Sequence, residues 1–202
     1  MMRQLLSPLL TSFRYVEAQR QTEPEARTTT SFASVSFHGL EHLGPPHIIE
    51  QIVQDWFELV HSVAPILHRA HFLKRLADGD AQRDYEFLDL VISICAATIA
   101  CLRRKSSAYD GVITVESCYD AVEQNRVYRP KKVTTLEWCQ TKYNLGVALA
   151  SQNGIDDSIA FLLISEATAG VKYLVYHKLE RMNFMSQQLL KRLYWLVFAA
   201  QW

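Results

Sequence analysis

The sequence predicts an all-α fold of six to seven helices packed around one central, buried helix. Apolar residues recur at three- and four-residue spacing in most segments after residue 45, which is the period of an amphipathic helix. Capping residues and glycine or proline stops separate these segments. No stretch of useful length shows the alternation of apolar and polar residues that a half-buried strand would need.

Length and composition predict one compact domain preceded by a flexible segment. The chain has 202 residues, of which 49% are hydrophobic, enough to build a sizeable core. Residues 20–36 are polar and lack helical or strand periodicity, so burial cannot offset the entropy lost on ordering them. We therefore expect residues 1–36 to form a flexible N-terminal segment and linker, and residues 37–202 to form the helical domain.

The first helix is expected to follow the Pro45-Pro46 pair and to end before Pro65. Its apolar stripe consists of Ile49, Ile52, Val53, Trp56, Phe57 and Val60. A short helix from about Arg69 to Ala77 follows, closed by Gly79, because glycine readily adopts the left-handed conformation at a helix end.

The next segment, residues 84–104, is predicted to be the central helix because it is apolar on nearly every side. Its apolar positions include Phe87, Leu88, Val91, Ile94, Cys95, Thr98 and Leu102. The run is shorter than the roughly 20 residues that span a bilayer, contains Asp89 and ends in the basic residues 103–105. It therefore indicates a buried core helix and no membrane association.

Capping signals divide the remaining chain. Thr114 is expected to cap a fourth helix, and Thr134 with Glu137 forms a capping-box pattern for a fifth. Asn153-Gly154 ends that helix, and Asp156-Asp157 opens a sixth. The sixth helix is expected to be long and to continue through Ile159, Leu162, Leu163, Glu166, Ala167, Gly170, Leu174 and Tyr176. The last helix is expected to run from Ser186 to the chain end.

Charge and cysteine content limit the partners. Lysine and arginine number 21, as do aspartate and glutamate, so the chain lacks the basic excess of a large phosphate-binding surface. Direct, specific DNA binding by this chain is therefore not expected. The four cysteines lie in apolar helical patterns and no secretory signal precedes them, which predicts reduced thiols in an intracellular protein.

Short basic runs lie at residues 103–105, 131–132 and 191–192, where phosphate contact or nuclear import competes with a structural explanation. Cations at a helix end complement its negative dipole, which accounts for Arg103 to Lys105 without a partner.

The sequence contains few features that indicate a metal site or a catalytic site. Histidines cluster as His38, His42 and His47 and again as His61, His68 and His71, but no acid or thiol recurs beside them at zinc-ligand spacing. A Gly-x-Ser-x-Gly elbow and a glycine-rich phosphate loop are both missing from the sequence. Glu166 and Glu180, placed on one long helix, are interpreted as solvated or capping carboxylates. We expect no catalytic, cofactor-binding or metal-binding residues.

Aromatic residues leave one alternative open. An effector cavity between helices would be largely apolar and aromatic, although such residues more often belong to the core. The candidates for lining it are Trp56, Phe57, Trp138, Tyr143, Tyr173, Tyr194, Trp195 and Phe198.

Two segments resemble the fungal-specific transcription factor domain. Residues 55–72 are similar to its opening signature, in which an aromatic-bearing helix leads into a Pro-Ile-Leu-His segment and then phenylalanine; the matching residues are Pro65, Ile66, Leu67, His68 and Phe72. Residues 189–198 resemble a later helix of that family, in which basic residues precede an aromatic-Trp pair; the matching residues are Lys191, Arg192, Tyr194 and Trp195.

The resemblance implies a non-catalytic regulatory domain of a fungal zinc-cluster transcription factor, located in the nucleus. Such factors bind DNA through a separate six-cysteine zinc cluster, and the spacing of the four cysteines here does not provide one, so no cofactor is expected. The implied partners are a DNA-binding module, other proteins and a small-molecule effector. A helical scaffold for protein–protein interaction is the alternative function.

The family domain continues beyond its basic-aromatic helix, so the resemblance also implies a truncated larger helical domain, incomplete at the C-terminus. The last helix carries apolar residues well beyond a single stripe, including Trp195 and Trp202. We therefore expect an exposed apolar patch there and self-association through the C-terminal helix.

Overall fold

The computed structural model describes residues 40–102, 109, 111–128, 133–154 and 156–200. The described part of the chain contains helices and no strand, which confirms the all-α prediction. Its α-helices are α2 (Pro46–Asp55), α3 (Arg69–Ala77), α4 (Tyr85–Cys101), α5 (Val115–Asn125), α6 (Leu136–Asn153), α7 (Ser158–His177) and α8 (Phe184–Ala200). The predicted flexible segment at residues 1–36, and the basic runs at 103–105 and 131–132, lie outside the described residues.

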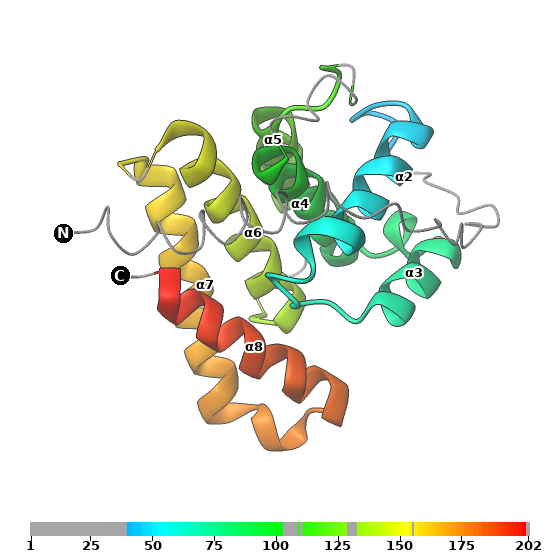
Figure 1. Cartoon of the computed structure of the whole chain (residues 1–202). Coiled ribbons are helices and arrows are strands. Elements are labelled where there is room, and N and C mark those ends of the chain that lie inside the picture. The colour runs from blue at the N-terminus through cyan, green and yellow to red at the C-terminus, as the bar shows by residue number, and fades with distance from the viewer. Residues whose placement is uncertain (1–39, 103–108, 110, 129–132, 155, 201–202) are drawn as a thin grey trace, which may run out of the picture.

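Helix α4 is central, as its composition predicts. Of its 17 residues, 13 are buried. It packs against α2, α5 and α6, so α2 and α3 lie on one side of it and α6 and α7 on the other (Figure 1). A helix that is apolar on all sides can bury nearly all of its surface only in such a position.

Polar side chains inside this core pair with one another. The Tyr109 hydroxyl donates to Asp55 over 3.0 Å, and the Asn125 amide donates to Asp89 over 2.9 Å. These contacts satisfy groups that would otherwise cost free energy when removed from water. They also tie α4 and α2 to their neighbours.

Three helix ends lie where the sequence predicts them. Helix α2 passes into a π-helical turn, Trp56–Val60, and the helical conformation stops before Pro65. Helix α3 is followed by Gly79 with φ of 73°. Helix α6 ends at Asn153, with Gly154 at φ of 98°. Glycine accommodates these positive φ values without the steric cost of a side chain.

Helix α6 begins one residue later than the capping-box pattern indicates. Thr135, rather than Thr134, accepts a hydrogen bond from the backbone N–H of Trp138. Glu137 does not complete a capping box and instead forms an ion pair with Arg75. The ion pair is a long-range contact, so no local pattern could reveal it.

The predicted long helix is present as α7. Its inner face contains Leu163, Ala167, Gly170 and Leu174, which are buried, whereas Ile159, Leu162, Glu166 and Tyr176 are exposed. Helix α7 is apolar on several sides, so periodicity alone leaves its inner face undetermined. Packing against α6 and α8 selects that face. Glu180 lies beyond α7, in the 3₁₀ turn Leu179–Arg181.

Helices α6 and α7 approach each other closely at Gly146. A Cβ atom there would lie 2.7 Å from Ile164 Cγ1 and 3.2 Å from the Ala160 carbonyl oxygen.

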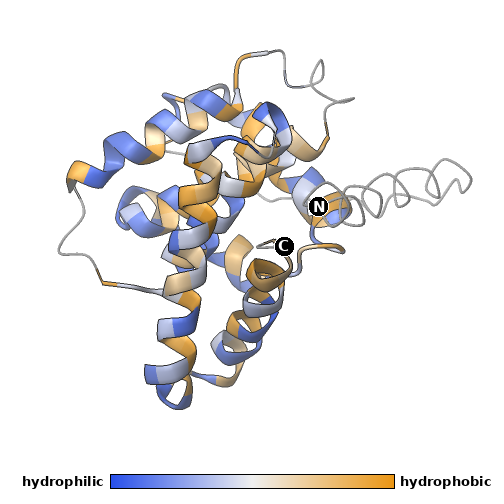
Figure 2. Ribbon diagram, turned by 90° about the vertical axis from the view of Figure 1, so that its left-hand side faces the viewer, coloured by the Kyte–Doolittle hydropathy of each residue, from blue (hydrophilic) through white to orange (hydrophobic). Residues whose placement is uncertain are grey.

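Helix α8 folds back along α7 and buries Leu189, Leu190, Leu193 and Val197. The apolar residues of α8 can be followed to the C-terminal end of the helix in Figure 2.

Helix α7, with 20 residues, is the described helix that is long and apolar enough to cross a bilayer by length and composition. Buried residues make up 39% of its apolar window. A core helix of a soluble protein passes the same test, so this feature is weak evidence for a membrane span.

Candidate functional site

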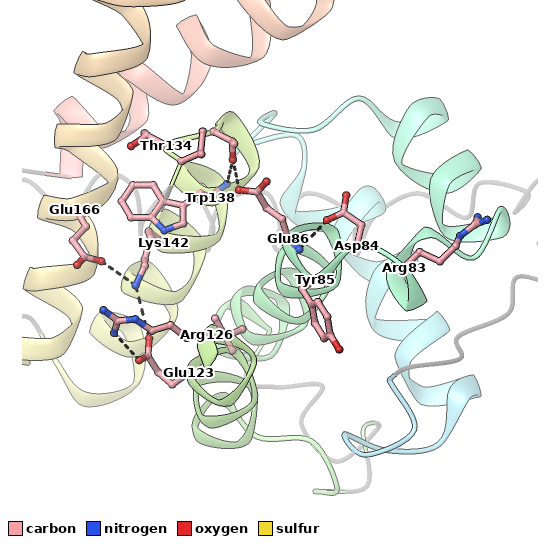
Figure 3. A pocket seen from close by; sticks show the side chains of 13 residues that line it. Arg83, Asp84, Tyr85, Glu86, Glu123, Arg126, Thr134, Trp138, Lys142 and Glu166 are labelled. Carbon is pink, nitrogen blue, oxygen red and sulfur yellow. Dashed lines mark hydrogen bonds and ion pairs between the residues drawn. The ribbon is translucent and has the colours of Figure 1, made fainter. Parts of the chain in front are cut away.

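A cavity of about 880 Å³ opens between the N-terminal ends of α4 and α6, the C-terminal end of α5 and the middle of α7 (Figure 3). Its volume lies within the range of small-molecule sites, roughly 300 to 1,000 Å³. Four helices contribute to its wall, which is formed by Arg83, Asp84, Tyr85, Glu86, Val122, Glu123, Arg126, Val133, Thr134, Thr135, Trp138, Lys142 and Glu166.

Lys142 is the most buried charged group in this wall, with 9% of its side chain exposed. Its Nζ lies 2.9 Å from Glu166 Oε2 and 3.8 Å from Glu123 Oε1. Glu123 also binds Arg126 over 3.1 Å. A buried ammonium is costly unless carboxylates compensate it, so Lys142 connects α6 to both α5 and α7.

Trp138 provides the aromatic part of the wall, one helical turn before Lys142, whose Nζ lies 6.0 Å from the centre of the ring. Its ring packs against α7 at Gly170, where a Cβ atom would lie 2.7 Å from Trp138 Cζ3 and 2.7 Å from Cys139 Sγ. The absence of a side chain at Gly170 therefore leaves room for the Trp138 ring.

Replacing Gly170 by alanine is expected to lower the free energy of unfolding by about 1 to 2 kcal/mol. The two contacts at 2.7 Å put the cost of overpacking in the upper part of its usual range, roughly 2 to 3 kcal/mol, and the better helix propensity of alanine returns about 1 kcal/mol. Denaturant unfolding measures the loss, and near-UV circular dichroism detects displacement of Trp138. Ala169→Ser, an equally small change on the exposed face of α7, serves as the control and should stay within about 0.5 kcal/mol of the original chain. Equal stability of both variants would contradict this account of Gly170.

The opposite side of the cavity is formed by two helix N-termini. Asp84 caps α4 by accepting from the N–H groups of Glu86 and Phe87. Thr135 caps α6, and its hydroxyl donates to the Glu86 carboxylate. These carboxylates therefore stabilise helix ends and join α4 to α6.

Arg75 lies behind this side and connects three elements. Its guanidinium binds Asp80 over 3.0 Å, Asp84 over 2.9 Å and also Glu137, and it stacks 4.0 Å from the centre of the Phe87 ring. Burial raises the pKa of Glu137, and the positive charge of Arg75 opposes that effect. Arg75 thus holds the N-terminal ends of α4 and α6 in the positions that shape the cavity.

The two segments that resemble the transcription factor domain meet in space. Arg192 Nη1 donates to the Pro65 carbonyl oxygen over 3.3 Å, across 127 positions of sequence. Ile66 is buried, and its carbonyl oxygen accepts from the Gln140 amide. Leu67 is also buried, and its carbonyl oxygen lies 2.9 Å from His61 Nε2.

The remaining motif residues have different environments. His68 caps α3, accepting from the N–H of His71, and Phe72 is buried. Lys191 is exposed and Tyr194 is half-buried. Trp195 is 67% exposed, whereas Trp202 lies outside the described residues. None of the motif residues lines the cavity.

The histidines that the structure describes are not gathered into a group of potential metal ligands. His61 and His68 make the backbone contacts just described, and His42, His47 and His71 are exposed. No group of three or more His, Cys, Asp or Glu side chains that could hold a metal ion occurs within the described ranges. His38 lies outside them.

The four cysteines are free thiols that lie in or beside the core. Burial raises the pKa of Cys95, Cys101 and Cys139 to about 12. A thiol that stays protonated is a weak nucleophile, so burial makes these thiols poor candidates for a nucleophilic site.

The aromatic residues expected around an effector cavity do not gather there. Among them, Trp138 alone is part of the cavity wall. Trp56, Phe57 and Tyr143 are buried in the core, Tyr194 is half-buried, and Tyr173, Trp195 and Phe198 are exposed.

Sequence reasoning missed the charged part of the wall. Glu166, interpreted as solvated, is half-exposed and paired with Lys142, and neither Glu123 nor Arg126 was singled out. One signal was present: apart from Glu137 in its first turn, the segment Leu136–Asn153 has Lys142 as its one charged residue, and a lysine among apolar and weakly polar residues needs a partner.

Comparison with family models, with curated proteins and with solved structures finds no match for this chain. The resemblance to the fungal-specific transcription factor domain therefore stays a prediction based on two sequence segments. The contact between Pro65 and Arg192 places these segments side by side.

Proposed function

We propose that this chain is a non-catalytic regulatory domain in transcription, of the kind that the fungal zinc-cluster resemblance implies, and that a small effector binds in its cavity. The observation that carries the proposal is the cavity itself, which has a volume suited to a small molecule and a wall shared by α4, α5, α6 and α7. The proposed location is the nucleus, and a separate module supplies DNA binding.

The cavity wall suggests how binding would be transmitted. Lys142, Glu123 and Glu166 hold α5, α6 and α7 together, so a ligand that contacts these groups acts on all three helices. A ligand changes a conformational equilibrium to the extent that it binds one arrangement more tightly than another. Specific DNA contact is left to the other module because the net charge of this chain is zero.

A tethering experiment tests the proposal. The full chain is fused to an unrelated DNA-binding module upstream of a reporter gene in fungal cells, and its output is compared with that of the module alone. We expect the fusion to change reporter output, and Trp138→Leu to alter that change because it reshapes the cavity wall. Immunoblotting confirms equal fusion levels. A fusion that behaves as the bare module would overturn the proposal.

A helical protein-interaction scaffold is the second candidate, and exposed side chains on the outer faces of α7 and α8 favour it. These side chains are Ile159, Phe161, Leu162, Tyr173, Tyr176, Phe184, Trp195 and Phe198. Large exposed apolar groups on neighbouring helices are typical of interaction surfaces, including self-association. A fusion that carries Phe184→Ser and Trp195→Ser separates the two functions. If this fusion loses its effect on the reporter and the fusion with Trp138→Leu keeps it, the result favours the scaffold.

A further inference from the structure

The cavity wall carries a row of alternating charges. Arg126, Glu123, Lys142 and Glu166 follow one another, with separations of 3.1, 3.8 and 2.9 Å between successive partners (Figure 3). They come from the 3₁₀ turn after α5, from α5, from α6 and from α7. The row contains two cations and two carboxylates, so its charge is balanced.

Exposure within the row decides which groups a ligand can reach. Lys142 is nearly buried, whereas 48% of the Glu166 side chain, 31% of that of Glu123 and 53% of that of Arg126 are exposed. An incoming ligand therefore meets a carboxylate of α7, a carboxylate of α5 and a guanidinium beside them. Trp138, Val122 and Val133 supply the apolar part of the same wall.

A ligand with one charge fits this row poorly. An anion that binds Arg126 leaves Glu123 without that cation, and a cation that binds Glu123 or Glu166 leaves an ammonium or guanidinium without its carboxylate. Uncompensated charge in a partly desolvated site is costly. A ligand with both charges exchanges one set of ion pairs for another and leaves the balance unchanged.

The other charged groups of the cavity have partners of their own. Asp84 binds Arg75 and caps α4, and Glu86 accepts from Thr135. Arg83 contacts Asp80 and the Asp78 carbonyl oxygen. These groups stabilise the opposite side, so the alternating row is the part of the wall that determines ligand charge.

We infer that the cavity binds a small zwitterion of the amino-acid type that carries an apolar side chain. Its carboxylate lies against Arg126, its ammonium group against Glu123 and Glu166, and its side chain against Trp138. This inference rests on the proposed effector function and adds the chemical class of the effector.

Three probes of similar size test the inference by isothermal titration calorimetry on the full chain at neutral pH: phenylalanine, phenethylamine, which lacks the carboxylate, and 3-phenylpropionate, which lacks the ammonium group. We expect phenylalanine to bind at least about tenfold more tightly than either single-charge analogue. Equal or tighter binding of either analogue overturns the inference.

Two cavity variants assign the charges. Arg126→Gln removes the partner of the ligand carboxylate and should reduce the preference for phenylalanine over phenethylamine by about tenfold. Glu166→Gln removes a partner of the ligand ammonium group and should reduce the preference for phenylalanine over 3-phenylpropionate by a similar factor. Lys191→Gln, on the exposed face of α8, is the control and should change neither preference. Thermal melts show that each variant is folded. Preferences that are unaltered in both cavity variants overturn the assignment.

The outcome also separates this inference from the proposed function. If none of the probes binds but the tethered domain responds to Trp138→Leu, the zwitterion inference fails and the regulatory proposal stands. If the probes bind as expected and the tethered domain has no effect on the reporter, the regulatory proposal fails and the binding site stands.

Discussion

Replacing Phe72 by alanine is expected to lower the free energy of unfolding by about 3 to 5 kcal/mol, as is usual for truncating a buried aromatic side chain. Phe72 is 3% exposed. Its ring lies 5.6 Å from the ring of Phe57 in an edge-on arrangement and 5.3 Å from the ring of Phe87. The substitution therefore removes the aromatic contacts of α3 with both the π-helical turn and α4.

Denaturant unfolding of the full chain measures this loss. Phe161, which is 62% exposed on α7, offers a matched control, and Phe161→Ala should change the free energy of unfolding by no more than about 0.5 kcal/mol. If both variants lose the same amount, Phe72 does not occupy the core and the segment that resembles the family signature is misplaced.

Replacing Arg75 by alanine is expected to lower the free energy of unfolding by about 2 to 4 kcal/mol. This loss is somewhat smaller than the roughly 3 to 5 kcal/mol typical of breaking a fully buried ion pair, because the partners of Arg75 are partly exposed. The side chain of Arg75 is 18% exposed, and its removal leaves Asp80, Asp84 and Glu137 without their shared cation. The stacking on Phe87 is lost as well.

The effect of Arg75→Ala should also depend on pH. The pKa of Glu137 is raised by burial and held down by Arg75, so loss of Arg75 raises it further. A carboxyl group with a raised pKa in the folded state destabilises the fold as pH rises through that pKa. The difference in free energy of unfolding between the original chain and Arg75→Ala should therefore be largest at neutral pH and should decrease on acidification, when Glu137 becomes protonated.

Arg83 provides the control for Arg75. It contacts the same carboxylate, Asp80, over 3.2 Å, but its side chain is 67% exposed. Exposed ion pairs are worth about 0 to 1 kcal/mol, so Arg83→Ala should have little effect at any pH. Similar losses for Arg75→Ala and Arg83→Ala would mean that burial of the Arg75 cluster is not what stabilises these helix ends.

Much of the fold follows from signals that act within a few residues. Thr114 caps α5 through a hydrogen bond with Ser117, and Asp157 caps α7 through the N–H groups of Ile159 and Ala160. The short helix α3 has the predicted bounds, Arg69–Ala77. These features are predictable because a cap or a stop involves neighbouring residues alone.

Signals in the amino-acid sequence predict the helical class, the central position of α4 and most helix ends, because apolar periodicity and capping are local properties of the chain. The inner face of α7, the Arg75 cluster and the cavity arise only when the helices pack against one another. Glu123, Lys142 and Glu166 belong to three helices and meet only after those helices pack. Their pairing depends on distances between segments far apart in the chain, which no local pattern of residue types records.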